Sequence, residues 1–240
     1  MNLKERFMRC LEGKEVDYAP VGCTTTYGVV DIMKKVGAER PLADTDPQAM
    51  ATLALGYVEA GFEWCKAMGW DITAVSEVMG CTLGEPKIDL QKYIKEHPLA
   101  ENLDGLTYPD NLFEQTRFPA YKEQFRILKD KLGDDVAVFG ETEGAWTAAC
   151  NLVGTEQFMK WTFKEPDKVQ QVLDVTQEVV TDVANWAFDQ GADYYVLAEP
   201  SSGPALMSPR IWKKYVQPML TAMVAKIKGP VVLHICANTD

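Results

Sequence analysis

The chain has 240 residues, and 35 acidic against 24 basic side chains leave a formal net charge of −11 at pH 7. With 47% apolar and 25% charged residues, it has the composition of a soluble globular protein, large enough for one α/β barrel or two smaller domains. The acidic balance argues against nucleic acid as a partner, and the lack of a secretory signal or of an apolar run of ~20 residues argues against a membrane, so we expect a cytoplasmic protein.

Apolar residues that recur at helical spacing predict five helices. Each is bounded by a capping residue, an early proline or a glycine stop. In chain order they cover Leu3 to Gly13, Asp46 to Val58, Tyr121 to Gly133, Pro166 to Gly191 and Ser208 to Met223. Pro218 lies inside the last helix, where a proline removes a backbone hydrogen bond, so we expect a kink there.

Short apolar runs between the helices predict buried parallel strands. Their ranges are Tyr18–Cys23, Asp71–Val75, Val136–Gly140, Tyr194–Ala198 and Val231–Cys236. The last three each follow a helix and a glycine, a rhythm typical of right-handed βαβ units. Residues 81–118 are less regular and are predicted to form an insertion over one end of the sheet.

Polar residues follow the carboxyl ends of these strands, and no glycine-rich phosphate loop does. They are Thr24, Thr25, Thr26, Glu77, Glu141, Glu143, Glu199, His234 and Cys236. Several strands that contribute to one polar face are typical of a TIM-type (β/α)8 barrel. We therefore predict a single α/β-barrel domain over residues 1–240, with an N-terminal helical extension. Only five strands are predicted before Asp240, so we expect the barrel to be truncated and its polar site incomplete.

The pair His234 and Cys236 is the most informative feature, because the chain has only two histidines. Side chains alternate along a strand, so both point to one side. Imidazole nitrogen and thiolate sulfur are ligands that zinc prefers, although a catalytic site needs a third protein ligand. The alternative is a buried histidine that bonds the backbone beside a packing cysteine. The other histidine, His97, is predicted to lie at the surface.

Two carboxylates are further candidates. Glu143 and Glu199 follow the third and fourth predicted strands, where they could position a substrate, ligate a metal or orient His234. The alternative is a solvated charge at a helix start or on the rim. Asp71 and Glu77 are weaker candidates. The six cysteines are scattered without a CxxC pair and read as reduced thiols, with Cys10, Cys65 and Cys150 in helical patterns.

Short motifs along the whole chain resemble those of the uroporphyrinogen decarboxylase superfamily, and within it the zinc-dependent methylcobamide:coenzyme M methyltransferases. They include Leu11-Glu12-Gly13-Lys14, Glu77-x-Met79-Gly80-Cys81, Glu143-Gly144, Phe158-Met159-Lys160-Trp161, Gly191-Ala192-Asp193, Leu206-Met207-Ser208-Pro209 and Leu233-His234-Ile235-Cys236. The resemblance implies a barrel in which His234 and Cys236 bind Zn²⁺. It places a third ligand, a cysteine, beyond residue 240.

Some residues depart from the pattern. Decarboxylases carry an arginine-containing motif after the first strand to hold substrate carboxylates, whereas the segment from Gly22 to Tyr27 has no basic residue. Glu199 stands where the methyltransferases have aspartate, and Ala237 where glycine is usual. These differences leave the methyl acceptor open.

The resemblance implies an enzyme that moves a methyl group from a methylated corrinoid, carried on a small corrinoid protein, to a zinc-activated thiol. Coenzyme M is the expected thiol, with another thiol or a folate as alternatives. In this reading His234 and Cys236 are the catalytic metal ligands, and Glu143 and Glu199 bind substrate. Two other functions stay open, a uroporphyrinogen decarboxylase-like enzyme without metal and a non-catalytic corrinoid- or tetrapyrrole-binding module.

Overall fold

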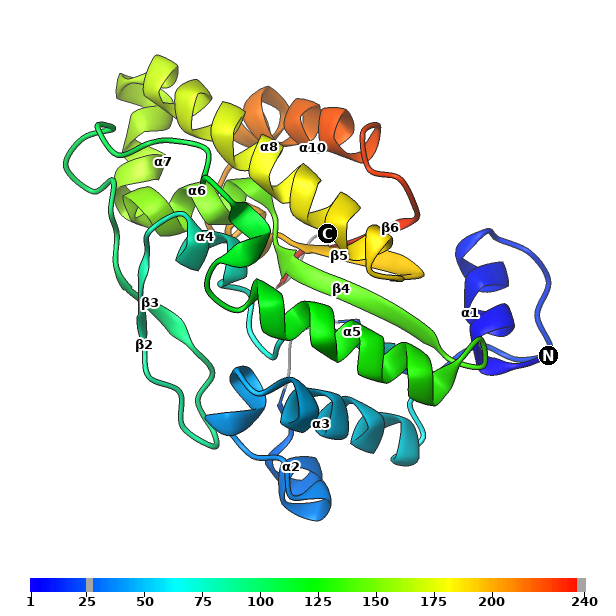
Figure 1. Ribbon diagram of the computed structural model, residues 1–240. Helices are drawn as coiled ribbons and strands as arrows, with labels where there is room; N and C mark the ends of the chain where they lie inside the picture. The colour runs from blue at the N-terminus through cyan, green and yellow to red at the C-terminus, as the bar shows by residue number, and fades with distance from the viewer. Residues whose placement is uncertain (25–27, 237–240) are drawn as a thin grey trace.

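A computed structural model describes residues 1–24 and 28–236, and its centre is a parallel sheet (Figure 1). Within that part of the chain four strands pair in the order β1 (Trp64–Lys66), β4 (Ala137–Glu143), β5 (Tyr194–Ala198) and β6 (Val231–His234). All three pairings are parallel. This confirms the α/β class. Among the described strands the sheet does not close on itself, because β1 and β6 each have one strand neighbour.

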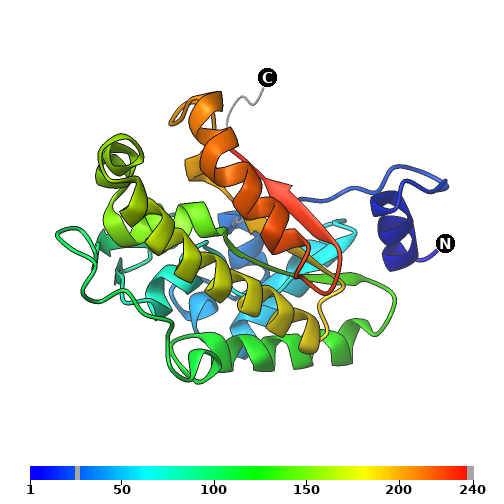
Figure 2. The same cartoon turned by 90° about the horizontal axis from the view of Figure 1, so that it is seen from above.

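Most helices pack along one side of the sheet, and α1 (Leu3–Leu11) lies near one end of it (Figures 1 and 2). The other helices are α2 (Val30–Val36), α3 (Pro47–Glu59), α4 (Ala74–Val78), α5 (Phe118–Leu132), α6 (Ala145–Val153), α7 (Thr155–Lys164), α8 (Pro166–Asp189), α9 (Pro209–Ile211) and α10 (Gln217–Val224). Short 3₁₀ helices cover Leu42–Asp44, Leu112–Glu114 and Pro200–Ser202. None of the described helices has the length and hydropathy needed to cross a bilayer.

The predicted helix after Ser208 is divided in three. The Ser208 side chain caps α9, a π-helical turn covers Trp212–Val216, and α10 begins with Gln217 and Pro218. A proline removes the N–H that would continue the α-helical ladder, and a π turn is one way to accommodate it. The helix is therefore irregular next to Pro218, as the sequence predicted.

Two predicted strands are wrong. Tyr18–Cys23 carries Pro20 and Gly22, which disfavour regular pairing. The Val21 carbonyl accepts from Glu63 N and the Cys23 carbonyl from Trp64 Nε1, each at 2.9 Å, but no strand forms there. Residues 71–73 form a bend, and Ala74 and Val75 are the first two residues of α4. The barrel strand of this region is β1, which places Cys65 in a strand and not in a helix.

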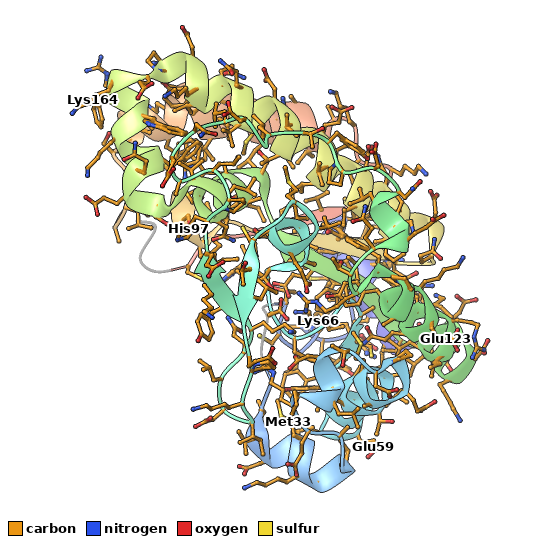
Figure 3. The ribbon with its side chains drawn as sticks, turned by 60° about the vertical axis from the view of Figure 1, so that its left-hand side comes forward. Met33, Glu59, Lys66, His97, Glu123 and Lys164 are labelled. Atoms are coloured by element: carbon orange, nitrogen blue, oxygen red, sulfur yellow. The ribbon has the colours of Figure 1, made fainter. Side chains whose placement is uncertain are left out.

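The segment at 81–118 contains the antiparallel pair β2 (Thr82–Gly84) and β3 (Tyr93–Glu96). His97 directly follows β3 and is exposed, as predicted (Figure 3). Thr25, Thr26 and Ala237 lie outside the described residues.

The two faces of the sheet contact different parts of the molecule. Residues of the outer face, such as Val138 and Leu197, belong to the main core with α3, α5 and α8. The inner face forms a separate cluster of Phe7, Trp64, Ala137, Phe139, Tyr194 and Val196. Phe7 comes from α1, and its ring lies 4.5 Å from that of Trp64 and 4.7 Å from that of Tyr194. Helix α1 therefore covers the amino end of the inner face, and the carboxyl end is where polar side chains remain.

Candidate metal and substrate site

His234 and Cys236 lie together at the carboxyl end of β6. The Nε2 atom of His234 is 3.0 Å from Sγ of Cys236. His234 is half-buried and Cys236 is exposed. The imidazole therefore contacts the Cys236 sulfur and is partly open to solvent. The alternative prediction, a buried histidine hydrogen-bonded to the backbone, does not describe it.

The donor chemistry of this pair fits zinc. One imidazole nitrogen and one thiol sulfur lie 3.0 Å apart, and both atom types are zinc ligands. Residues 1–24 and 28–236 contain no group of three or more His, Cys, Asp or Glu side chains that could hold a metal. Within this part of the chain the pair thus offers two donors, fewer than the three protein ligands that a catalytic zinc site needs.

Glu143 ends β4 on the same face as His234. The register pairs Glu143 with Ala198 and Ala198 with His234, so these three side chains form one row across β4, β5 and β6. The Glu143 side chain is fully buried. Its Oε1 accepts a hydrogen bond from Ser76 N at 2.7 Å, and its Oε2 has no hydrogen-bond partner among the described residues. Burial raises the pKa of Glu143 to about 7.

Glu199 caps a helix. Its Oε1 accepts from Trp146 N at 3.1 Å, and its Oε2 accepts from Thr147 N at 2.8 Å and from Thr147 Oγ1 at 2.7 Å. These donors lie at the start of α6, where unpaired amides and the helix dipole favour a carboxylate. Burial raises the pKa of Glu199 to about 7 against these hydrogen bonds. The backbone amide of Glu199 also donates to the His234 carbonyl at 2.8 Å.

The structure therefore separates the two carboxylates. Neither is a solvated rim charge, since both are fully buried. The Glu199 carboxylate is occupied by α6 and supports His234 only through the backbone. Gly144 is required beside it, because a Cβ there would overlap the Glu199 carboxylate. Of the two, Glu143 is the carboxylate with an oxygen, Oε2, that has no hydrogen-bond partner among the described residues.

A buried ion-pair cluster next to Glu143 was missed by sequence reasoning. Arg117, which precedes α5, donates to both oxygens of Asp71 at 2.6 and 3.1 Å and to Glu77 Oε2 at 2.6 Å. Burial alone would raise the pKa of Asp71, but the Arg117 guanidinium outweighs burial and lowers that pKa to about 2. Glu77 lies in α4 and not after a strand. Asp71 and Glu77 were visible in the sequence, whereas nothing local marked Arg117 as their partner.

A second buried pair lies deeper on the inner face. The Lys66 Nζ atom is 2.5 Å from Glu141 Oε2, and both side chains are buried. Lys66 lies among the ribbons in Figure 3, whereas Glu123 projects from the outer side of α5. The polar end of the inner face thus combines paired charges with the Glu143 carboxyl.

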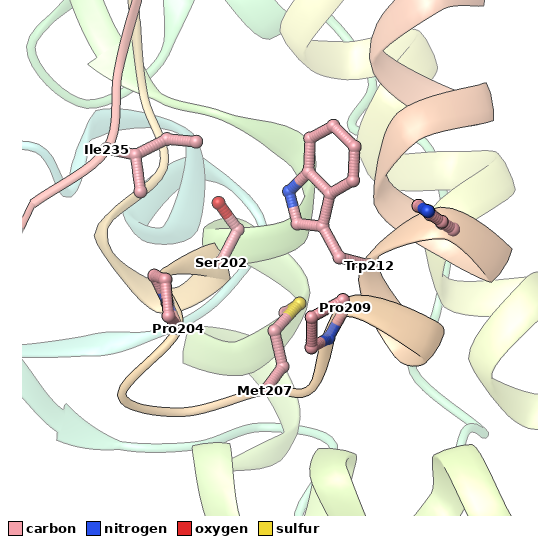
Figure 4. Close-up of a pocket in the computed structure, with 7 residues that line it drawn as sticks. Ser202, Pro204, Met207, Pro209, Trp212 and Ile235 are labelled. Carbon is pink, nitrogen blue, oxygen red and sulfur yellow. The ribbon is translucent and has the colours of Figure 1, made fainter. Parts of the chain in front are cut away.

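A small apolar cavity of about 280 Å³ is lined in part by Ile235, the residue between His234 and Cys236 in sequence (Figure 4). Its lining residues are Ser202, Pro204, Met207, Pro209, Trp212, Lys213 and Ile235. Ile235 stands between the two candidate ligands in sequence, so alternation turns it away from them. The cavity therefore lies behind the pair.

Comparison with known proteins decides the family. The family model described as uroporphyrinogen decarboxylase (URO-D) matches residues 2–240. The chain belongs to this family. The resemblance of its short motifs is thereby confirmed, and so is the barrel type of the fold, of which the described sheet forms one part of the wall.

Within the uroporphyrinogen decarboxylase family, similar proteins that match almost the whole chain include methyltransferases. A methylcobamide:CoM methyltransferase MtaA of Methanosarcina barkeri (strain Fusaro / DSM 804) is 37% identical over 238 residues, which are 99% of this chain and 70% of that protein. A solved methyltransferase from Methanosarcina mazei superposes with a TM-score of 0.96 at 35% identity, over 100% of this chain and 71% of that one. A uroporphyrinogen decarboxylase of Wolbachia sp. subsp. Brugia malayi (strain TRS) is 23% identical over 167 residues, 66% of this chain and 44% of that protein. The chain is thus more similar to these two methyltransferases than to this decarboxylase.

Proposed function

We propose that this protein transfers a methyl group from a methylated corrinoid to the thiol of coenzyme M. The observation that carries the proposal is the convergence of His234 Nε2 and Cys236 Sγ at the carboxyl end of β6. The family assignment supports it, because relatives that match almost the whole chain are methylcobamide:CoM methyltransferases. The partners would be a small corrinoid protein and the thiol.

His234 and Cys236 would hold the zinc ion. When bound, zinc lowers the pKa of a coordinated thiol and fixes the position of its sulfur. The exposed side of Cys236 leaves room for a substrate to approach. The backbone hydrogen bond from Glu199 to the His234 carbonyl holds the end of β6 against β5. It thereby fixes the backbone from which the imidazole extends.

The reaction needs a thiol that has lost its proton, because a thiol at neutral pH is mostly protonated and weakly nucleophilic. The substrate sulfur attacks the methyl carbon of methyl-Co(III) and a sulfur–carbon bond forms. The cobalt–carbon bond breaks, its electron pair stays on cobalt, and Co(I) is left. Glu143 shares the inner-face row with His234 and is the side chain we assign to the substrate side of the site.

The test removes one ligand at a time. Cys236→Ala and His234→Ala should each lower zinc content from about one per chain to near zero. They should also slow demethylation of methylcobalamin by coenzyme M at least about 100-fold, with the circular dichroism spectrum unchanged. Cys10→Ala is the matched control, since Cys10 is also an exposed cysteine but lies on α1, away from β6 in sequence and structure.

Wild-type protein without bound zinc, or full activity in either ligand variant, would overturn the proposal. Decarboxylation of a porphyrinogen by zinc-free protein would point instead to the decarboxylase-like function.

A further inference from the structure

Residues 200–236 carry the opposite charge to the rest of the chain. The chain has a formal net charge of −11, yet this stretch contains five basic and no acidic residues. The basic residues are Arg210, Lys213, Lys214, Lys226 and Lys228. Lys228 pairs with Asp189, whereas Arg210 and Lys213 are exposed and form no ion pair with any residue of 1–24 or 28–236. Their positive charge is therefore available to a partner.

The same stretch lines the apolar cavity of about 280 Å³. Figure 4 shows Trp212 and Ile235 on opposite sides of this cavity. Lys213 is also a lining residue, and Arg210 directly follows another, Pro209. Small-molecule pockets usually have volumes of about 300–1,000 Å³, so a cavity of this size is better suited to a side chain of a partner protein. The cavity, Arg210 and Lys213 together make up a basic patch.

The basic patch lies beside the candidate metal ligands. Ile235, which lines the cavity, is the residue between His234 and Cys236. The backbone of Gly203 also lies against Cys236, because a Cβ at Gly203 would come within 3.0 Å of the Cys236 carbonyl oxygen. A protein that brings a methylated corrinoid to a thiol at this pair must cover the surface around it. An interface buries about 800 Å² on each partner, the area of a disc of roughly 16 Å radius, so a footprint centred on the pair takes in the neighbouring cavity.

A second copy of this chain fits the patch less well than an acidic partner does. In a dimer with two-fold symmetry about the patch, Arg210 and Lys213 would face their own copies. Like charges that face each other oppose association. A partner with carboxylates around an apolar side chain has the complementary charge and shape.

We propose that the basic patch docks the small corrinoid protein that delivers the methyl group. The inference rests on the proposed function. An apolar side chain of the corrinoid protein enters the cavity beside Trp212, and carboxylates around it meet Arg210 and Lys213. Opposite charges speed the encounter, and the buried apolar contact slows dissociation. No bond forms or breaks at the patch, so it acts on delivery of the methyl group and not on its transfer.

The test compares two methyl donors, free methylcobalamin and a methylated corrinoid protein of Methanosarcina barkeri, the organism of a relative that is 37% identical. A variant with both Arg210→Glu and Lys213→Glu reverses the charge of the patch, and should raise KM for the corrinoid protein at least about tenfold at low salt. Its rate with free methylcobalamin and coenzyme M should stay within about twofold of wild type. Lys34→Glu is the matched control, because Lys34 is an exposed lysine on α2, away from α10 and β6 (Figure 1).

Two further measurements separate the charged part of the patch from its apolar part. Salt screens exposed charges, so raising NaCl from about 0.05 M to about 0.5 M should weaken the wild-type reaction with the corrinoid protein and bring it close to that of the double variant. Trp212→Ala should raise KM for the corrinoid protein at least about tenfold at both salt concentrations, because a tryptophan in an interface pocket commonly dominates binding. Zinc content per folded molecule should not change in either variant.

The outcomes separate the docking proposal from the proposed function. A double variant with the wild-type KM for the corrinoid protein would overturn the docking proposal, and so would an equal loss of rate with both donors. Wild-type protein that reacts with methylcobalamin but not with the corrinoid protein would leave the proposed methyl transfer standing and remove the docking patch. Wild-type protein that reacts with neither donor would contradict the proposed function, and the docking proposal with it.

A second copy as the occupant has its own signature. Sedimentation would then show a wild-type dimer that dissociates in the double variant, and the docking proposal would be wrong. The double variant changes only exposed side chains, so it decides the question even if Trp212→Ala does not fold.

Discussion

The two faces of the parallel sheet differ in what they bury. On the outer face, Val138, Tyr195 and Leu197 pack under helices and are fully buried. On the inner face, apolar rings close the amino end around Phe7, while the carboxyl end buries Lys66, Glu141 and Glu143. Burying a charge costs free energy unless the charge is paired, so this polar end stabilises the fold less than an apolar one would. The outer face contributes apolar packing to stability, and the inner carboxyl end is where chemistry can be done.

The largest effect on stability is expected where a buried charge loses its partner. Arg117→Ala would leave Asp71 buried and ionised without its guanidinium, and should lower the free energy of unfolding by about 3–5 kcal/mol. Urea unfolding measures this change. Arg126→Ala, which removes an exposed pair with Glu123 and Asp130, should cost less than about 1 kcal/mol. Equal losses of unfolding free energy in the two variants would show that the buried ion pair contributes no more to stability than the exposed one.

An apolar truncation on the outer face should cost slightly less and leave the chemistry intact. Leu197 is fully buried in the main core, so Leu197→Ala should lower the free energy of unfolding by about 3 kcal/mol. Zinc content and the rate of methyl transfer per folded molecule should not change, because the side chain points away from the row of Glu143, Ala198 and His234. A variant that folds but loses zinc would show that the two faces are not separable.

The sequence predicted the elements whose signals are local. The strands of β4, β5 and β6 are apolar runs between capped helices, and their positions were found within a few residues. The pair His234 and Cys236 was found because alternation along one strand is a local rule. The strand signals and the alternation rule both depend only on residues within about ten positions along the chain.

Elements that depend on distant partners were misplaced or missed. Strand β1 has three residues, one of them a lysine, and becomes recognisable only when Lys66 meets Glu141 on β4. Tyr18–Cys23 has the composition of a strand, yet Gly22 lies so close to the Trp64 indole that a Cβ would overlap it. Glu143 and Glu199 looked equivalent in sequence. They differ because Glu199 meets the start of α6, whereas Glu143 meets Ser76 of α4.

The smallest effect on the fold is expected at the site itself. Cys236 is exposed beyond the end of β6, so in metal-free protein Cys236→Ala should change the free energy of unfolding by less than about 0.5 kcal/mol. A ligand that binds only the folded state stabilises it by about 2.7 kcal/mol at a hundredfold excess over its dissociation constant. Added zinc should therefore stabilise wild-type protein by roughly that amount at such a concentration, and Cys236→Ala by much less at the same concentration. Thermal unfolding with and without zinc measures both quantities, and Cys10→Ala should follow wild type. Equal stabilisation of wild type and Cys236→Ala would mean that zinc binds elsewhere. The carboxyl end of the inner face would then not be the site of the reaction.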